Sequence, residues 1–185
     1  MNVWRVKRSL ALFALLALPA LAGAETLDLG AHGKFSIAAP KDWTYSTQRM
    51  QDTGWTVTLS APAGANAKCL LTLVYTDAAE PLSKEKVQSD VLGACDQFVA
   101  ESVEKVKVLR DFDVPGAYGV YCVFTDASMV GKPVQPDSFK AVAMGEVRLS
   151  DEVTMSVSLL FDDEKGAEFR AMLAAVSSAS VSGSK

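Results

Sequence analysis

Apolar and polar residues alternate along several short segments of the chain, which is the pattern of strands with one buried face. The clearest cases are residues 55–61 and 153–161, where apolar side chains alternate with Thr and Ser. Pro40 lacks a backbone donor and ends an apolar segment at residues 34–38. Further strands are predicted at residues 43–48, 69–75, 106–114, 118–125 and 139–149.

Two other segments carry apolar residues three or four positions apart, which is the spacing of an amphipathic helix. The first helix is predicted to follow an N-cap at Ser83, with Glu85 in its first turn. Its apolar stripe consists of Val87, Val91, Cys95, Phe98, Val99 and Val103. The second helix is predicted to be capped by Asp162 or Asp163. Its apolar stripe consists of Phe169, Met172, Leu173 and Val176.

These elements predict an α+β fold. The strands are joined by short turns rather than by helical crossovers, so we expect a single, largely antiparallel sheet. Each helix has only one apolar stripe, so the long middle helix and the C-terminal helix should pack on opposite faces of this sheet, as an α/β/α sandwich. One domain is expected over residues 25–176, and the Ser-rich residues 177–185 are expected to form a flexible tail.

The first 24 residues have the pattern of a secretory signal peptide. Three basic residues lie within the first eight positions, an apolar run covers residues 10–21, and small residues follow at 22–24. A 12-residue helix measures about 18 Å, less than the roughly 30 Å of bilayer hydrocarbon, so this run is too short for a membrane anchor. We therefore expect cleavage between Ala24 and Glu25 and a periplasmic or secreted protein.

Charge narrows the classes of partner. Removal of residues 1–24 takes away three of the 18 basic residues and none of the 22 acidic ones, which leaves a formal net charge of −7. Nucleic acids and anionic membrane surfaces are bound through basic residues, so neither is an expected partner. No later apolar run is long enough to span a bilayer, so we expect no stable membrane insertion after cleavage.

The segment GKFSIAAPKDW at residues 33–43 combines a short strand with Phe35, Pro40 and Trp43. This motif and the predicted element order resemble the Mog1/PsbP-like domains, including their exported bacterial and DcrB-like branches. The resemblance covers most of residues 25–176 as an order of elements. It implies an accessory, assembly or partner-binding role and no catalytic residues, because this family has no shared catalytic constellation. A cystatin-like or other sheet-plus-helix fold stays open as an alternative.

Candidate catalytic residues are few. His32, the only histidine, lies in a glycine-rich turn near the expected mature N-terminus, which is a poor place to hold a general base. The sequence contains no HExxH, GxSxG, phosphate-binding glycine loop or CxxC motif. We therefore expect neither an enzyme nor a bound cofactor.

The densest acidic cluster is Asp162-Asp163-Glu164, where a strand is followed by a helix. Carboxylates at this point can accept hydrogen bonds from the first amides of the helix, so we interpret the cluster as a helix cap. Adjacent residues cannot face one another across a cleft as glycosidase carboxylates do. A calcium site is the remaining alternative, although the DxDxDG spacing is absent.

The three cysteines, Cys69, Cys95 and Cys122, do not have the spacing of a zinc site. In an oxidising compartment one pair should form a disulfide. We expect the pair to be Cys69–Cys95, which closes a loop of about 25 residues, with Cys122 as a buried free thiol. A Cys69–Cys122 bridge, or three reduced thiols that act as small apolar residues, stay open.

Two surfaces are candidates for binding. One is the hydroxyl-lined sheet face that carries Thr56, Thr58, Ser60, Thr72, Thr154, Ser156 and Ser158. The other is the connection over residues 126–138, whose Met129 and Val130 form an apolar tip in a loop longer than most hairpins.

We conclude from the sequence that the protein is an exported, non-enzymatic accessory domain that binds a protein partner in the cell envelope through Met129 and Val130. An immunity protein against a secreted toxin would be a special case of this role. The alternative from a different class is a periplasmic carrier that holds a small apolar or lipid-like ligand between sheet and helix.

Overall fold

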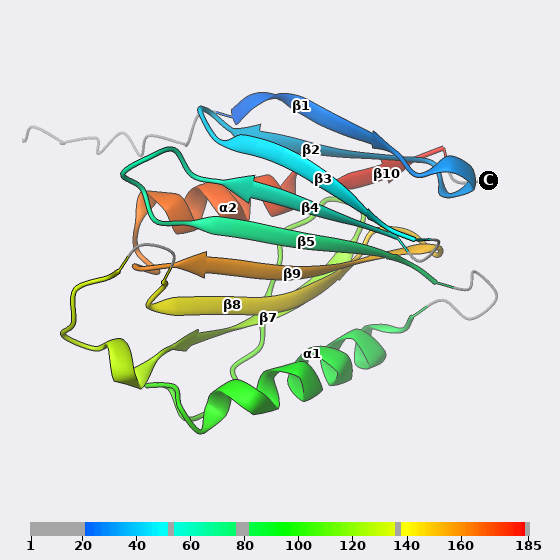
Figure 1. Cartoon of the computed structure of the whole chain (residues 1–185). Coiled ribbons are helices and arrows are strands. Elements are labelled where there is room, and N and C mark those ends of the chain that lie inside the picture. Colours follow the sequence, from blue (N-terminus) through cyan, green and yellow to red (C-terminus); the bar gives the residue numbers. More distant parts are fainter. Residues whose placement is uncertain (1–20, 52–53, 77–81, 136–137, 184–185) are drawn as a thin grey trace, which may run out of the picture.

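The computed structural model describes residues 21–51, 54–76, 82–135 and 138–183. Most of the expected signal peptide, residues 1–20, lies outside the described residues. Within them the chain forms two α-helices and two antiparallel sheets, of seven and three strands, which confirms the predicted α+β class (Figure 1). No helix in these ranges is long and apolar enough to cross a membrane.

The larger sheet has the strand order β3-β4-β5-β9-β8-β7-β6, and its neighbouring strands run antiparallel. Its strands are β3 (Thr44–Met50), β4 (Gly54–Ser60), β5 (Lys68–Tyr75), β6 (Arg110–Asp111), β7 (Tyr118–Thr125), β8 (Ala141–Arg148) and β9 (Val153–Phe161). The alternation in the sequence agrees with the register, because Thr72 lies opposite both Thr56 and Ser156. Small hydroxyl residues therefore line up across neighbouring strands on one face.

The smaller sheet consists of β1 (Leu21–Asp28), β2 (Lys34–Pro40) and β10 (Ser180–Ser182), in the order β1-β2-β10. Two details of the sequence prediction are therefore corrected: there are two sheets rather than one, and part of the expected tail is a strand. Both partners of β2 come from segments without apolar alternation, so the pattern gave no sign of them. The expected Ala24–Glu25 cleavage bond lies within β1, where these residues pair with Ala38 and Ile37.

Helix α1 (Lys84–Val99) begins as predicted, because the Ser83 hydroxyl accepts a hydrogen bond from the Lys86 N–H at 3.1 Å. Helix α2 (Ala167–Ser177) begins later than predicted, and its N-cap is Gly166 rather than Asp162 or Asp163. The cause is a turn before the helix, in which the Gly166 N–H donates to the Asp163 carbonyl at 3.0 Å.

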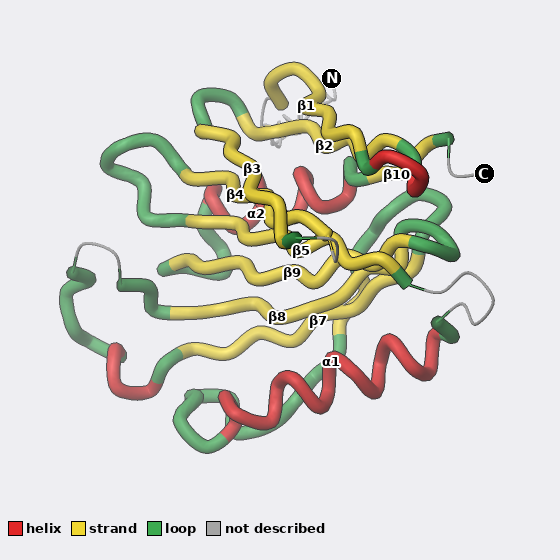
Figure 2. The backbone as a smooth tube through the Cα atoms, turned by 45° about the vertical axis from the view of Figure 1, so that its right-hand side comes forward, coloured by secondary structure: helices red, strands yellow, loops and turns green. Residues whose placement is uncertain are grey.

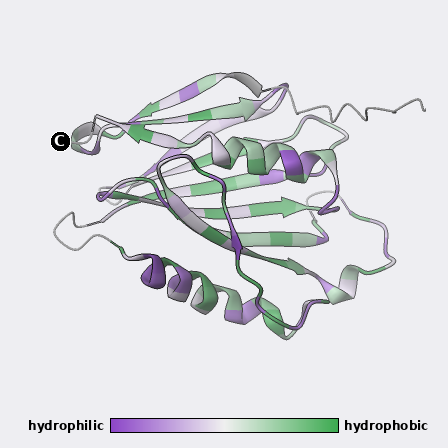
Figure 3. Cartoon of the chain, turned by 180° about the vertical axis from the view of Figure 1, so that it is seen from behind, coloured by the Kyte–Doolittle hydropathy of each residue, from purple (hydrophilic) through white to green (hydrophobic). Residues whose placement is uncertain are grey.

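The two helices pack on opposite faces of the larger sheet, as the sequence predicts (Figure 2). On β7, Val120, Cys122 and Phe124 point toward α1. Figure 3 shows that the first turns of α1 are strongly hydrophilic on their outer side, as expected for a helix with one buried stripe.

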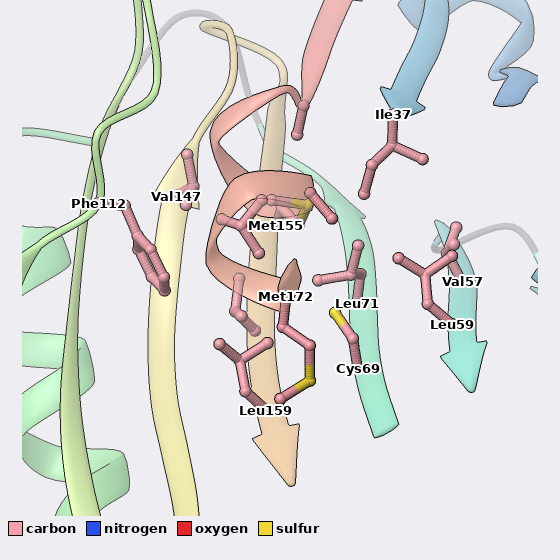
Figure 4. Close-up of a cluster of buried hydrophobic side chains, with 14 of the residues drawn as sticks. Ile37, Val57, Leu59, Cys69, Leu71, Phe112, Val147, Met155, Leu159 and Met172 are labelled. Carbon is pink, nitrogen blue, oxygen red and sulfur yellow. The ribbon is translucent and has the colours of Figure 1, made fainter. Parts of the chain in front are cut away.

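Helix α2 fills the space between the two sheets and forms the main core with them. Met172 of α2 is fully buried close to Leu159 and Cys69 of the larger sheet (Figure 4). Phe35 and Ile37 of β2 belong to the same buried cluster, so the smaller sheet covers the outer side of α2.

The segment at residues 106–114 was expected to be a full strand, but only Arg110 and Asp111 pair, with Tyr121 and Val120. Residues 106–109 belong to the connection from α1 to β6, and residues 112–114 belong to the connection from β6 to β7. Val106 and Val108 are 55% and 56% exposed, whereas Phe112 and Val114, which follow β6, are buried in the main core.

Candidate functional site

Among the described residues, no helix packs against one half of a face of the larger sheet. Helix α1 packs on β7 and β8, whereas the same face of β4, β5 and β9 extends beyond it. We call this the open face, and its residues are Thr56, Thr58, Ser60, Leu70, Thr72, Ser156, Ser158 and Leu160. Helix α2 lies on the opposite face of the sheet, so it does not cover the open face.

A cavity of about 490 Å³ lies where the open face meets α1. Its floor is apolar and is formed by Leu70, Leu160, Val142 and Met144 from three adjacent strands. Its wall is formed by Phe98 of α1 and Phe124 of β7, whose rings stack with centroids 5.6 Å apart. This combination of an apolar floor and an aromatic wall suits an apolar group of a ligand.

The mouth of the cavity is polar and is held by backbone hydrogen bonds. Glu101, Asp126 and Lys140 lie at the lining, and the first two are exposed. The Val103 N–H donates to the Thr125 carbonyl at 2.8 Å, and the Ala127 N–H donates to the Glu101 carbonyl at 3.0 Å. These bonds fix the end of α1 to the end of β7, so the wall does not depend on side-chain packing alone.

Asp126 keeps its negative charge readily at this mouth. Hydrogen bonds from Ser128 lower the pKa of Asp126, and the charge of Lys132 lowers it further. The Ser128 N–H donates to the Asp126 carboxylate at 2.8 Å, which starts the short 3₁₀ turn η2 (Ala127–Met129). The carboxylate therefore has a structural role and also supplies a charge beside the cavity.

Glu146 of β8 lies two residues from the floor residue Met144 and on the same face. One of its carboxylate oxygens is buried and has no hydrogen-bond partner among the described residues. Burial raises the pKa of Glu146, the charge of Asp90 raises it further, and Lys86 opposes the shift. The carboxyl group is thus more easily protonated in the folded than in the unfolded chain.

This shift predicts how stability depends on pH. A folded-state pKa raised above the ordinary 4.5 adds stability that is present below 4.5 and is lost as the pH rises through the folded-state value. Glu146→Gln is therefore expected to stabilise the protein at neutral pH and to flatten its stability between acidic and neutral pH. Urea unfolding at several pH values measures this, with the exposed Glu101→Gln as the charge-matched control. Equal effects of the two variants would contradict it.

His32 lies outside the cavity and joins the two sheets. Its Nδ1 is 3.1 Å from a Glu152 oxygen, and its ring stacks on Tyr75 with centroids 4.0 Å apart. The turn η1 (Gly30–His32) that carries it connects β1 to β2, whereas both partners belong to the larger sheet or its turns. These contacts give His32 a structural role.

The acidic residues 162–164 do not converge on one site. Asp162 accepts hydrogen bonds from the Asn66 amide and from the Lys140 N–H, and Glu164 pairs with Arg110. Asp163 accepts from the Lys165 N–H at 2.9 Å. Within the described residues, no three His, Cys, Asp or Glu side chains are grouped as metal ligands would be.

The expected Cys69–Cys95 disulfide is incompatible with this fold. Cys69 points toward α2, whereas Cys95 lies on α1, on the other side of the sheet. The alternative Cys69–Cys122 pair fails for the same reason, because Cys122 points toward α1. All three cysteines are reduced and buried in the structure, and Cys95 and Cys122 share one cluster. Strand alternation indicates that Cys69 is buried, but the sequence does not show which helix packs on its side of the sheet. The pairing of Cys69 with Cys95 could therefore not be judged from the sequence.

Met129 and Val130 lie beside the cavity rather than in its lining. Met129 ends η2, and Val130 follows it with 62% of its surface exposed. Residues 136–137 of the same connection lie outside the described residues.

Sequence reasoning missed the cavity itself, although one signal was available. Leu70 lies opposite Thr58 and Ser158, and Leu160 lies two residues after Ser158 on the same face. Alternate residues of a strand lie on opposite faces of the sheet, so an apolar residue among the polar positions indicates apolar surface on the otherwise polar face.

Comparisons with known proteins add no assignment to this geometry. No protein-family model matches the sequence, and a search of the curated proteins finds no match.

Proposed function

We propose that this protein is an exported, non-enzymatic accessory domain, and that it binds an apolar segment of a protein partner at the cavity and the adjoining loop. The proposed location is the periplasm or the extracellular space, which rests on the signal-like residues 1–24. The resemblance of the element order to Mog1/PsbP-like domains favours the accessory role.

The observation that carries this proposal is exposed apolar surface next to the cavity. Val103 is 51% exposed and directly follows the cavity residue Ser102, and Val130 is 62% exposed just beyond η2. A small molecule in the cavity would leave these valines in water, whereas a protein partner can cover them together with the cavity.

The chemistry of the candidate nucleophiles supports a role without catalysis. Burial raises the pKa of the Cys95 thiol to about 12, and the neighbouring Cys122 adds to the shift. Burial also raises the pKa of Cys69 and of Cys122. Reactive cysteines need an accessible thiolate, so these thiols are suited to packing rather than to nucleophilic catalysis.

Charge favours a partner that is neutral or basic around its apolar anchor. Glu101 and Asp126 are exposed at the mouth of the cavity, and the chain after residue 24 has a net charge of −7. Opposite charge on the partner would speed association and suppress acidic competitors.

The test is to fill the cavity. Ser158→Trp places a large ring on the cavity floor, and it is expected to weaken partner capture by about tenfold or more, since a filled cavity cannot receive an anchor. Capture is measured by immobilising the protein and quantifying what it retains from the envelope fraction of its own cells. Thr58→Trp is the matched control, because Thr58 lies on the same open face but outside the cavity lining. Equal capture by both variants would overturn the proposal.

A second candidate function, a carrier of a small apolar ligand, is favoured by the size of the cavity. Its volume of about 490 Å³ is typical of small-molecule sites. Solvent extraction and mass spectrometry of the protein purified from its own cells distinguish the two roles. An apolar molecule present in the native protein and absent from Ser158→Trp, without any change in partner capture, would favour the carrier.

A further inference from the structure

Two of the three cysteines face each other across the contact between α1 and the larger sheet. Cys95 lies on the buried stripe of α1, Cys122 lies at the middle of β7, and both are fully buried. Helix α1 packs against β7, and the side chains of both cysteines belong to the one buried cluster between these two elements. Val91 and Val120 belong to the same cluster, so the two sulfur atoms are enclosed by packed apolar side chains.

We propose that Cys95 and Cys122 are a disulfide-forming pair whose oxidation joins α1 covalently to β7 beside the cavity. The oxidant is a low-molecular-weight or protein disulfide, as is found in oxidising compartments. A thiolate of one cysteine attacks this disulfide and releases one thiol, which gives a mixed disulfide. The second cysteine then attacks its partner's sulfur and releases the second thiol. Overall, two cysteine thiols lose two protons and two electrons, and the oxidant's disulfide is reduced to two thiols.

The burial of the pair determines when this reaction occurs. Thiol–disulfide exchange requires a thiolate that the oxidant can reach. In the folded protein both thiols are enclosed and their pKa values are raised, so exchange is disfavoured. The bond therefore forms while the chain folds, when α1 approaches β7, and it is then protected from reduction.

The bond would also fix the wall of the cavity. Phe98 lies three residues after Cys95 on α1, and Phe124 lies two residues after Cys122 on β7. These stacked rings form the wall, so a covalent link about one helical turn away holds them at one separation. Cys69 takes no part, because its side chain lies under α2 on the other side of the sheet.

The sequence makes this pairing easy to map. Trypsin separates the three cysteines into the peptides 69–84, 87–105 and 111–140, because Lys132 is followed by Pro133. The full chain is reduced, unfolded and refolded with oxidised and reduced glutathione, then alkylated in denaturant and digested without reductant. We expect peptide 87–105 linked to peptide 111–140 and peptide 69–84 alkylated. A link that includes peptide 69–84, or three alkylated peptides, would overturn the proposal.

Stability provides a second measurement that does not depend on mapping. The urea midpoint of the oxidised protein is expected to be higher than that of the protein treated with reductant. Cys69→Ser should keep this difference, whereas Cys95→Ser and Cys122→Ser should each abolish it. A redox-dependent midpoint that survives in Cys95→Ser would contradict the pairing. These outcomes do not involve partner capture, so they are independent of the proposed function.

Discussion

Met172→Ala is expected to lower the free energy of unfolding by about 2–5 kcal/mol, the range found when a large buried side chain is truncated. Met172 is fully buried at the centre of α2, close to Leu159 and Cys69 of the larger sheet (Figure 4). Phe35 and Ile37 of the smaller sheet belong to the same core. The void that the truncated side chain leaves would therefore lie between two sheets, which cannot readily move together to fill it.

Urea denaturation of the variant and of the wild-type protein measures this change. Arg170→Ala is the matched control, because Arg170 lies on the exposed side of the same helix, two residues away. Its side chain donates to the Lys165 carbonyl at the surface, and we expect its loss to change stability by about 0.5 kcal/mol or less. A Met172→Ala change as small as the control would mean that α2 does not hold the two sheets together.

The strands and helices that carry a strong apolar period could be predicted from the sequence. Residues 153–161 form β9 as the alternation indicates, and the stripe from Phe169 to Val176 is the buried side of α2. In these segments the position of each side chain follows from the period of the element alone, which is a local property.

Strand partners could not be predicted in the same way. The segment 34–38 is predicted as a strand from the sequence, but no strand is predicted at its partners, residues 21–28 and 180–182. Residues 21–24 are assigned to the signal peptide, residues 25–28 to the start of the domain, and residues 180–182 to the tail. Pairing is a long-range choice that depends on which surfaces remain uncovered, and Ser180 and Ser182 have no apolar pattern to indicate it. The single sheet expected from the sequence became two for this reason.

The candidate site was only partly predictable. The hydroxyl-lined face was recognised from Thr56, Thr58 and Ser156, but the cavity depends on where α1 ends across that face. The cysteine pairing could not be predicted for the same reason. The apolar stripe of the first predicted helix places Cys95 on its buried side, but it does not indicate which strand lies against Cys95. Cys122 was considered as a lone buried thiol, and only the tertiary packing brings the two together.

Met129→Asp combined with Val130→Asp is expected to weaken partner capture by about tenfold or more, which corresponds to a loss of at least about 1.4 kcal/mol in binding free energy. Val130 is 62% exposed and follows η2, which begins beside the cavity residue Asp126. An apolar anchor at this position would become a carboxylate that must lose its hydration on binding. The fold should be retained, because an exposed loop tip contributes little to the core.

The control for this variant must add the same charge at a distant surface. Ser180→Asp combined with Ser182→Asp does so on β10, whose two serines are exposed at the opposite end of the molecule from η2 (Figure 1). If both pairs of substitutions weaken capture equally, added negative charge is responsible and the loop is not the anchor. If neither pair weakens capture but Ser158→Trp does, the partner contacts the cavity alone. Loss of capture with the loop variant and not with the β10 variant would place the partner across both the loop and the mouth of the cavity, where the exposed valines adjoin the apolar floor.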